Sequence, residues 1–470
     1  MAIFVARHPG SGCKTAKARV ALWCSGVPRT SKMADVTDTV TDTASGVPAL
    51  RRIAHLDMDA FYGSVELLRY PQLTGLPVVI GGSRRQAGGP LTAEGAGRPM
   101  HNIPLAAFER LGGYVGRGVI TTATYPARQF GVGSAMGLMK AARLCPQAIL
   151  LPADFDAYRD ASRRFKAVIT ALTPAMEDRG IDEVYIDFTA VPLGQAEGGR
   201  VLAALLQQRI FEATGLTCSI GVAPNKLLAK MASEFNKPNG ISVLHEADLQ
   251  ARIWPLACRK INGIGPKAGD KLALHGIHTI GELAQQTEPW LVQHFGRATG
   301  AWLHACAWGH DVRAVVTESE PVSMSRESTF ERDLHAVQDR AELGQIFTAL
   351  CERVAADLQR KGYAGKTIGI KLRYADFSTV TRDLTLGSAT DDAATLRRVA
   401  GLCLKRAPLT QRLRLLGVRV GALVRTKEGK DGVPGSRESA LQAGAFAAVL
   451  PLTRRARSGP DADPYTAPLF

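Results

Sequence analysis

The distribution of apolar residues between positions 53 and 235 constrains the fold more than any other feature of this sequence. Short runs with strand periodicity alternate irregularly with amphipathic stretches of helical periodicity. The expected strands are 53–57, 76–80, 119–122, 181–188 and 217–222, and the expected helices are 61–68, 135–144, 157–170, 201–213 and 225–235. A doubly wound sheet would need regular alternation of strand and helix, so the pattern predicts an α+β fold. A chain of 470 residues is long enough for several domains.

The rest of the chain divides by pattern into a helical region, a linker and a second mixed region. Residues 248–310 predict short helices joined by glycine turns, and residues 314–321 predict a linker. Strands are expected after it at 367–374, 379–386 and 413–424. Residues 1–50 and the residues after 425 show no sustained periodicity, which is typical of disordered tails.

The net charge of +15 indicates a polyanionic partner, and nucleic acid is the usual one. The eight cysteines include no C-x-x-C pair, so neither a zinc site nor a disulfide framework is indicated and a cytoplasmic location is expected. No apolar run reaches the roughly 20 residues that span a bilayer, and the apolar stretch at the N-terminus is too short for a secretory signal. Membrane association is therefore not expected.

Two acidic clusters lie at predicted strands, Asp57 with Asp59 and Asp182 with Glu183. If the two strands lie side by side, their carboxylates meet, and Mg²⁺ prefers such hard oxygen ligands. Two ions about 4 Å apart would clamp the attacking and leaving oxygens of a phosphoryl transfer. The alternative is that the acids are solvated or cap neighbouring helices.

Three other stretches carry cationic or phosphate-binding residue types. Arg128 lies near Tyr125 and offers planar donors to phosphate oxygens, although an arginine beside a tyrosine is also an ordinary surface pair. Lys226 and Lys230 are spaced one helical turn apart and are interpreted as a solvated helix face. The glycine-rich stretch 261–267 has helix–hairpin–helix spacing, which favours contacts to a phosphate backbone over a plain turn between helices.

The strings DMDAFYGSVE and GIDEVYIDF resemble two acidic motifs of the Y-family DNA polymerases, of the bacterial DNA polymerase IV type. Further motifs follow in the family order, so the resemblance covers roughly residues 52–425. It implies two Mg²⁺ ions held by Asp57, Asp182, Glu183 and the backbone carbonyl of Met58. Asp59 and Asp187 match positions that are usually structural.

The resemblance also implies roles in substrate binding. Tyr62 matches the steric gate that rejects ribonucleotides, and Ala60 matches a position where a small residue leaves room near the nascent pair. Triphosphate binding is expected from Thr122, Tyr125, Arg128 and Lys237. Contacts to DNA are expected from Gly263, Gly265, Lys267 and Arg326. Thr124 and Gly180 depart from the residues that many relatives have there, but neither departure removes a metal ligand.

The family architecture is a right hand, with palm, fingers, thumb and little finger. By resemblance the palm covers 51–60 and 153–245, and the fingers cover 61–152 with an insertion at about 86–116. The thumb covers 246–313, and the linker 314–321 joins it to the little finger at 322–425. The extension 1–50 precedes these domains and the tail 426–470 follows them. The little-finger region carries 18 Lys and Arg against 11 Asp and Glu, as expected for a DNA-facing domain.

The expected activity is low-fidelity, template-directed DNA synthesis across lesions by a DNA-directed nucleotidyltransferase without proofreading. The expected partners of this monomer are primer–template DNA, a deoxynucleoside triphosphate and the sliding clamp (the β subunit), which would take up Leu469 and Phe470 of the C-terminal peptide. Two alternatives are a catalytically inactive scaffold that recruits bypass partners and a glycosylase or nuclease built around the hairpin motif. Neither alternative explains why the acidic clusters and the steric-gate tyrosine occur together.

Overall fold

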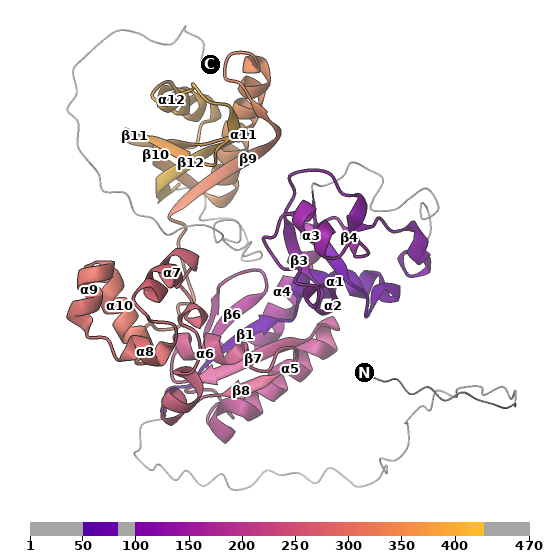
Figure 1. The fold of residues 1–470 in the computed structure, drawn as a ribbon, viewed down its shortest axis with the longest axis vertical. Coiled ribbons are helices and arrows are strands. Elements are labelled where there is room, and N and C mark those ends of the chain that lie inside the picture. The colour runs from indigo at the N-terminus through magenta and orange to yellow at the C-terminus, as the bar shows by residue number, and fades with distance from the viewer. Residues whose placement is uncertain (1–49, 83–98, 427–470) are drawn as a thin grey trace, which may run out of the picture. The chain divides into compact units, whose positions relative to one another are not determined.

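The computed structural model describes residues 50–82 and 99–426, which form three sheets and a helical region (Figure 1). The largest sheet has five strands in the order β5-β6-β1-β7-β8. Its strands are β1 (Ile53–Met58), β5 (Met176–Asp178), β6 (Glu183–Asp187), β7 (Cys218–Ala223) and β8 (Ile241–Val243). The central strand β1 pairs antiparallel with both β6 and β7. Strands β7 and β8 are parallel, so the sheet mixes both directions, which confirms the expected α+β class.

The two faces of β1 are covered by different helices. Ala54, Leu56 and Met58 belong to a core shared with helices α4 (Phe155–Leu172) and α5 (Arg200–Thr214). Ile53, on the opposite face, belongs to a core with helix α6 (Lys226–Ser233). Because strand residues alternate between faces, His55 and Asp57 also lie on the α6 face. Strand β1 is therefore covered on both faces, and its two polar residues share the α6 face.

A three-stranded sheet has the order β3-β2-β4, with one face in the core that contains Leu56 and the other face in a separate core. It contains β2 (Val78–Gly81), β3 (Ile120–Ala123) and β4 (Ile149–Leu151), with helices α1 (Phe61–Arg69), α2 (Tyr125–Arg128) and α3 (Leu138–Leu144). Helix α3 begins three residues later than the pattern predicts, because Ala135 has a φ of 64°, which is left-handed.

Residues 249–307 are helical, as expected. The helices are α7 (Pro266–Leu274), α8 (Ile280–Ala284), α9 (Glu288–Phe295) and α10 (Arg297–Ala307). Their buried residues share one core with α6, so this region packs against the five-stranded sheet through that helix. Thr279 and Glu282 form a capping box at the start of α8, which satisfies the free N–H groups of its first turn.

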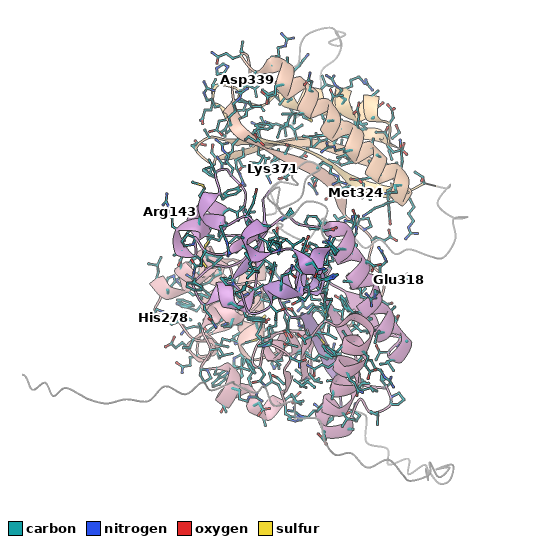
Figure 2. The ribbon with its side chains drawn as sticks, turned by 90° about the vertical axis from the view of Figure 1, so that its right-hand side faces the viewer. Arg143, His278, Glu318, Met324, Asp339 and Lys371 are labelled. Carbon is teal, nitrogen blue, oxygen red and sulfur yellow. The ribbon has the colours of Figure 1, made fainter. Side chains whose placement is uncertain are left out.

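The last region is a four-stranded sheet with the order β11-β10-β12-β9 and two helices. Its elements are β9 (Ser323–Leu334), β10 (Tyr363–Tyr374), β11 (Thr379–Thr390), β12 (Leu413–Arg425), α11 (Arg340–Lys361) and α12 (Ala393–Lys405). Met324, labelled in Figure 2, shares a core with both helices. Lys371, on the opposite face, pairs with Glu327 at 2.9 Å. One face of this sheet is therefore apolar and the other is polar.

Candidate active site

The two acidic clusters meet at one end of the central sheet. Asp57 on β1 lies opposite Glu183 on β6, and the N–H of Met58 donates to the carbonyl of Asp182 at 3.0 Å. The expected convergence of the two stretches, 125 positions apart along the chain, is confirmed. Strand β6 begins at Glu183, so Asp182 precedes the strand and strand alternation does not force the two neighbouring acids apart.

The three carboxylates differ in their electrostatic surroundings. Burial raises the pKa of Asp57 to about 6, and the negative charge of Asp182 adds to the rise while Lys237 opposes it. Burial and the charge of Glu183 also raise the pKa of Asp182. Burial would raise the pKa of Glu183 as well, but the ammonium of Lys230 beside it lowers this pKa below its usual value. Burial and mutual repulsion therefore disfavour the charged forms of these carboxylates, and nearby cations offset part of this effect.

Two lysines supply that positive charge. The ammonium group of Lys237 lies 3.0 Å from Asp57 Oδ2 and 2.5 Å from Glu234 Oε1. Lys230 donates to Glu183 Oε2 and is about one-quarter exposed. The interpretation of Lys230 as a solvated helix residue is therefore wrong. Helical spacing shows which residues share a face, and the register of the neighbouring strands decides what that face meets.

The donor set fits divalent metal ions of the magnesium type. Asp57, Asp182 and Glu183 offer hard oxygen atoms at adjacent strand ends, and the repulsion among these acids would be relieved by a bound cation. Among the described residues, no three Asp, Glu, His or Cys side chains lie close enough together to form a ready metal-binding cluster. Lys230 and Lys237 contact two of the carboxylates instead.

Tyr62 lies beside this site in an aromatic cluster. Its ring centroid is 4.5 Å from that of Tyr158 and 6.0 Å from that of Phe155. Burial and the charge of Asp182 raise the pKa of Tyr62 to about 12, so the phenol is neutral. The residue is only partly buried, which leaves part of its ring accessible beside the carboxylates. Both a packing role and the predicted steric gate are compatible with this placement.

The predicted triphosphate residues lie on β3 and α2. Arg128 stacks on the ring of Tyr125 at 4.7 Å, while its Nε donates to the carbonyl of Ala123. The hydroxyl of Tyr125 is buried and has no hydrogen-bond partner, one of three such side-chain polar atoms among the described residues. A buried orphan donor needs an explanation, and an absent anionic ligand supplies one. Thr122 is buried on the same strand as Ala123.

The remaining acids of the motifs are engaged within the fold. Strand β1 ends at Met58, so Asp59 lies in the following turn. Its carboxylate is buried and accepts from Ser219 Oγ at 2.7 Å and from the N–H of Asn239 at 2.8 Å. Asp187 accepts from the N–H of Thr189 at 2.9 Å. Ala60, with a φ of 44°, completes the turn and caps helix α1.

The glycine-rich stretch 261–267 forms the turn before helix α7. Gly263 has a φ of 112°, and a Cβ at this position would lie 2.8 Å from Trp302. Gly265 is the N-cap of α7, and Lys267 in its first turn is exposed. The turn leaves free N–H groups at the beginning of a nine-residue helix.

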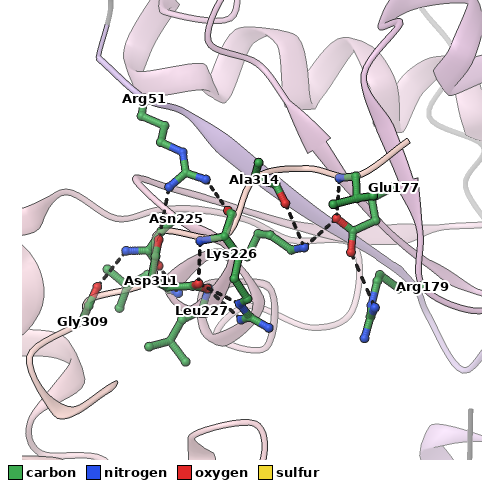
Figure 3. Close-up of polar contacts among 12 residues, drawn as sticks. Arg51, Glu177, Arg179, Asn225, Lys226, Leu227, Gly309, Asp311 and Ala314 are labelled. Atoms are coloured by element: carbon green, nitrogen blue, oxygen red, sulfur yellow. Dashed lines mark hydrogen bonds and ion pairs between the residues drawn. The ribbon is translucent and has the colours of Figure 1, made fainter. Parts of the chain in front are cut away.

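A buried polar network ties the end of the helical region to the sheet (Figure 3). Lys226 Nζ lies 2.6 Å from Glu177 Oε2, and both side chains are more than nine-tenths buried. Lys226 also donates to the carbonyl of Ala314, and the N–H of Val316 donates to Glu177. Asp311 accepts from the N–H of Leu227. The interpretation of Lys226 as solvated is wrong for the same reason as for Lys230.

Beside Glu183 is a hollow of about 460 Å³. It is lined by residues of the sheet, of α6 and of the helical region, among them Glu183, Lys226, Lys230, Trp302 and Arg313. Basic side chains outnumber acidic ones in its lining, which suits a phosphate backbone better than a neutral ligand.

Arg326, which was predicted to contact DNA, has a charged partner within the protein. Its guanidinium pairs with both carboxylate oxygens of Asp357 on helix α11, at 2.6 and 2.9 Å. It shares the helix-covered face of β9 with Met324 and Phe330. Contact with DNA would require this pair to open. The extension 1–49, part of the insertion (83–98) and the clamp peptide with Leu469 and Phe470 lie outside the described residues.

Comparison with known proteins identifies the family. Residues 56–234 match the model of the impB/mucB/samB family, and residues 321–432 match the model of the C-terminal domain of that family. Residues 256–310 match the helix–hairpin–helix motif model of DNA polymerase eta and Rev1. Among the described residues, no helix combines the length and apolar character needed to cross a membrane.

Curated relatives extend the match over most of the chain. The chain is 38% identical to DNA polymerase IV of Streptomyces coelicolor over 79% of its own length and 71% of that protein. It is 35% identical to DNA polymerase IV of Caulobacter vibrioides over 87% of its own length and 94% of that protein. Its fold matches a solved Y-family DNA polymerase chimera with a TM-score of 0.66 and 23% identity, over 80% of this chain and all of that one. The chain therefore belongs to the Y family of DNA polymerases, with the enzymes named DNA polymerase IV among its relatives.

Proposed function

We propose that this translesion DNA polymerase joins a deoxynucleotide to a primer 3′-hydroxyl at the carboxylates of Asp57, Asp182 and Glu183, using two magnesium ions. The observation that carries the proposal is the register that places Asp57 opposite Glu183, with Asp182 bound to the next residue of β1. When bound, the ions would lower the pKa of the attacking hydroxyl and stabilise the charge on the leaving pyrophosphate. The carbonyl of Met58 would complete the ligand set.

The residues around the carboxylates would position the nucleotide. Arg128 has its Nε bonded to Ala123, so its two terminal nitrogens are available to a triphosphate. Tyr125 offers its unpartnered hydroxyl, and Lys237 would turn from Asp57 toward phosphate oxygens when a metal ion takes its place. Thr122 would add a hydroxyl donor. Tyr62 would lie under the sugar and exclude a 2′-hydroxyl by contact.

A phosphate of the DNA backbone would bind at the mainly basic hollow beside Glu183. The backbone N–H groups after Gly263 and Gly265, together with Lys267, would hold a phosphate of the duplex. On the polar face of the last sheet, Arg373 and Arg419 add positive charge. These contacts are to the backbone, so they carry no sequence preference. We further propose that the protein acts as a monomer, without a proofreading site, and binds a sliding clamp through Leu469 and Phe470.

Primer extension by Asp182→Ala tests the proposed centre. We expect the rate to fall roughly 1,000-fold or more, as when other groups that act directly on the transition state are removed. Binding of primer–template DNA should be kept. Asp156→Asn, an exposed acid on α4, is the matched control and should extend primers normally. Extension by Asp182→Ala at the wild-type rate would refute the proposal. If Asp182→Ala binds DNA but does not extend it, the carboxylate serves catalysis and not a scaffold role.

A further inference from the structure

Glu183 is the only one of the three carboxylates that contacts a histidine as well as a lysine, within the part of the chain that the structure describes. His55 is fully buried on β1, and its Nε2 lies 3.3 Å from Glu183 Oε2. Lys230 Nζ contacts Glu183 Oε2 and lies 3.3 Å from His55 Nε2. His55 Nδ1 lies 2.8 Å from Ser233 Oγ. Four side chains from β1, β6 and α6 therefore form one connected group.

The hydrogen atoms of this group can be placed from its contacts. Ser233 Oγ lies 2.8 Å from the carbonyl oxygen of Lys230, and two oxygens at that distance require a proton between them. The single hydroxyl proton of Ser233 is thereby used, so Ser233 accepts from His55 and the proton of the imidazole is on Nδ1. Nε2 is then an acceptor. The ammonium of Lys230 can donate to both His55 Nε2 and Glu183 Oε2.

The backbone holds this arrangement close to the sheet. Gly221 on β7 lies opposite His55 on β1. A Cβ on Gly221 would lie 2.2 Å from the carbonyl oxygen of Ala229 and 2.3 Å from the N–H nitrogen of Ser233. Only a residue without a side chain permits helix α6 to approach this closely. The close approach brings Lys230 and Ser233 within reach of His55.

We propose that Lys230, held by His55 and Ser233, is a positioning residue for Glu183 and an internal counter-ion of the active site. This inference rests on the proposed role of Glu183 as a metal ligand. The ammonium fixes the direction of the carboxylate and stabilises its negative charge, and it also repels any divalent cation that binds beside it. Lys230 thus weakens metal binding and improves catalysis by the metal-bound enzyme, because the carboxylate is held in place for the reaction.

Direct metal binding and primer extension together test this role. Free Mn²⁺ is measured by electron paramagnetic resonance as the ion is added to the full-length protein without nucleotide or DNA. Lys230→Met should bind Mn²⁺ on the order of tenfold more tightly, the size of the repulsion between a divalent ion and an ammonium a few ångströms away in a water-like dielectric. Its single-turnover extension rate at saturating metal should fall about tenfold, since Glu183 is no longer oriented.

Matched variants separate this role from simple loss of structure. Lys230→Arg keeps the charge and should bind Mn²⁺ as the wild type does. Lys271→Met removes a lysine from helix α7, far along the chain from the carboxylates, and should change neither quantity. Ser233→Ala removes the acceptor of His55 Nδ1 and should lower the extension rate with little change in melting temperature. If Lys230→Met does not fold, Lys230→Gln removes the same charge and repeats the test.

The outcomes distinguish the inference from the proposed function. Unchanged or weaker Mn²⁺ binding by a folded Lys230→Met or Lys230→Gln would overturn the counter-ion role. A wild-type extension rate for these variants would overturn the positioning role. Asp182→Asn serves as the reference: if it binds Mn²⁺ as tightly as the wild type, the carboxylate centre itself is refuted. If Asp182→Asn loses binding while Lys230→Met behaves as the wild type, only the inference about Lys230 fails.

Discussion

Lys226→Met should loosen the segment that follows the helical region. The variant keeps the length of the side chain and removes the charge that faces Glu177 at 2.6 Å. Breaking a buried ion pair from one side costs about 3–5 kcal/mol, because the partner stays buried without compensation. Glu177 retains the N–H of Val316 at 2.8 Å and has Arg179 at 3.6 Å, so we expect a loss near the lower end, about 3 kcal/mol.

Hydrogen exchange measured peptide by peptide is the suitable assay, since a chain with several domains does not unfold in one two-state step. A local loss of about 3 kcal/mol corresponds to exchange roughly 100-fold faster. The acceleration should be confined to peptides that contain β5, α6 and residues 309–316, because Lys226 and Glu177 bind the backbone of Ala314 and Val316. Peptides from the last sheet should exchange at the wild-type rate.

Two further variants calibrate the result. Arg209→Met breaks a pair with Glu212 that is about half exposed, and should change local exchange by less than about fivefold, as surface pairs contribute at most about 1 kcal/mol. The double variant Lys226→Met with Glu177→Met removes both buried charges and should recover most of the loss. If folded Lys226→Met exchanges residues 309–316 within about threefold of the wild type, the pair does not anchor this segment.

Three more predictions follow from the active site and the hairpin turn. Since burial raises the pKa of Asp57 to about 6, a proton competes with the metal below that pH. The Mg²⁺ concentration for half-maximal extension should therefore rise about fivefold between pH 6 and pH 5, and a flat profile would contradict the metal role of Asp57. Tyr62→Ala should raise ribonucleotide incorporation on the order of 100-fold in primer extension, while Phe155→Ala in the same aromatic cluster should not. Gly263→Ala should weaken primer–template binding about tenfold in a fluorescence anisotropy titration, because its Cβ would strike Trp302 and the φ of 112° is unfavourable with a side chain; equal affinities for variant and wild type would show that the turn makes no DNA contact.

Local sequence pattern determines much of this protein. The strands around Asp57 and Glu183 and the helices between them follow from apolar periodicity, because alternation and helical spacing are properties of neighbouring residues. Element boundaries were less accurate, as at α3, where Ala135 adopts a left-handed conformation that periodicity does not report. The family resemblance likewise rests on contiguous strings, and the comparisons confirm it.

The tertiary structure decided which side chains serve as partners. The sequence places Lys230 and His55 175 positions apart and shows only a lysine at helical spacing and a histidine in an apolar strand. Their contact depends on the register of β1 with β7 and on the close approach of α6 at Gly221. Arg326 likewise has a partner, Asp357, that only the packing of α11 on β9 supplies. Chain-local patterns specify elements and faces, whereas the pairing of charges across the fold is set by strand register and helix packing, which no single stretch of sequence encodes.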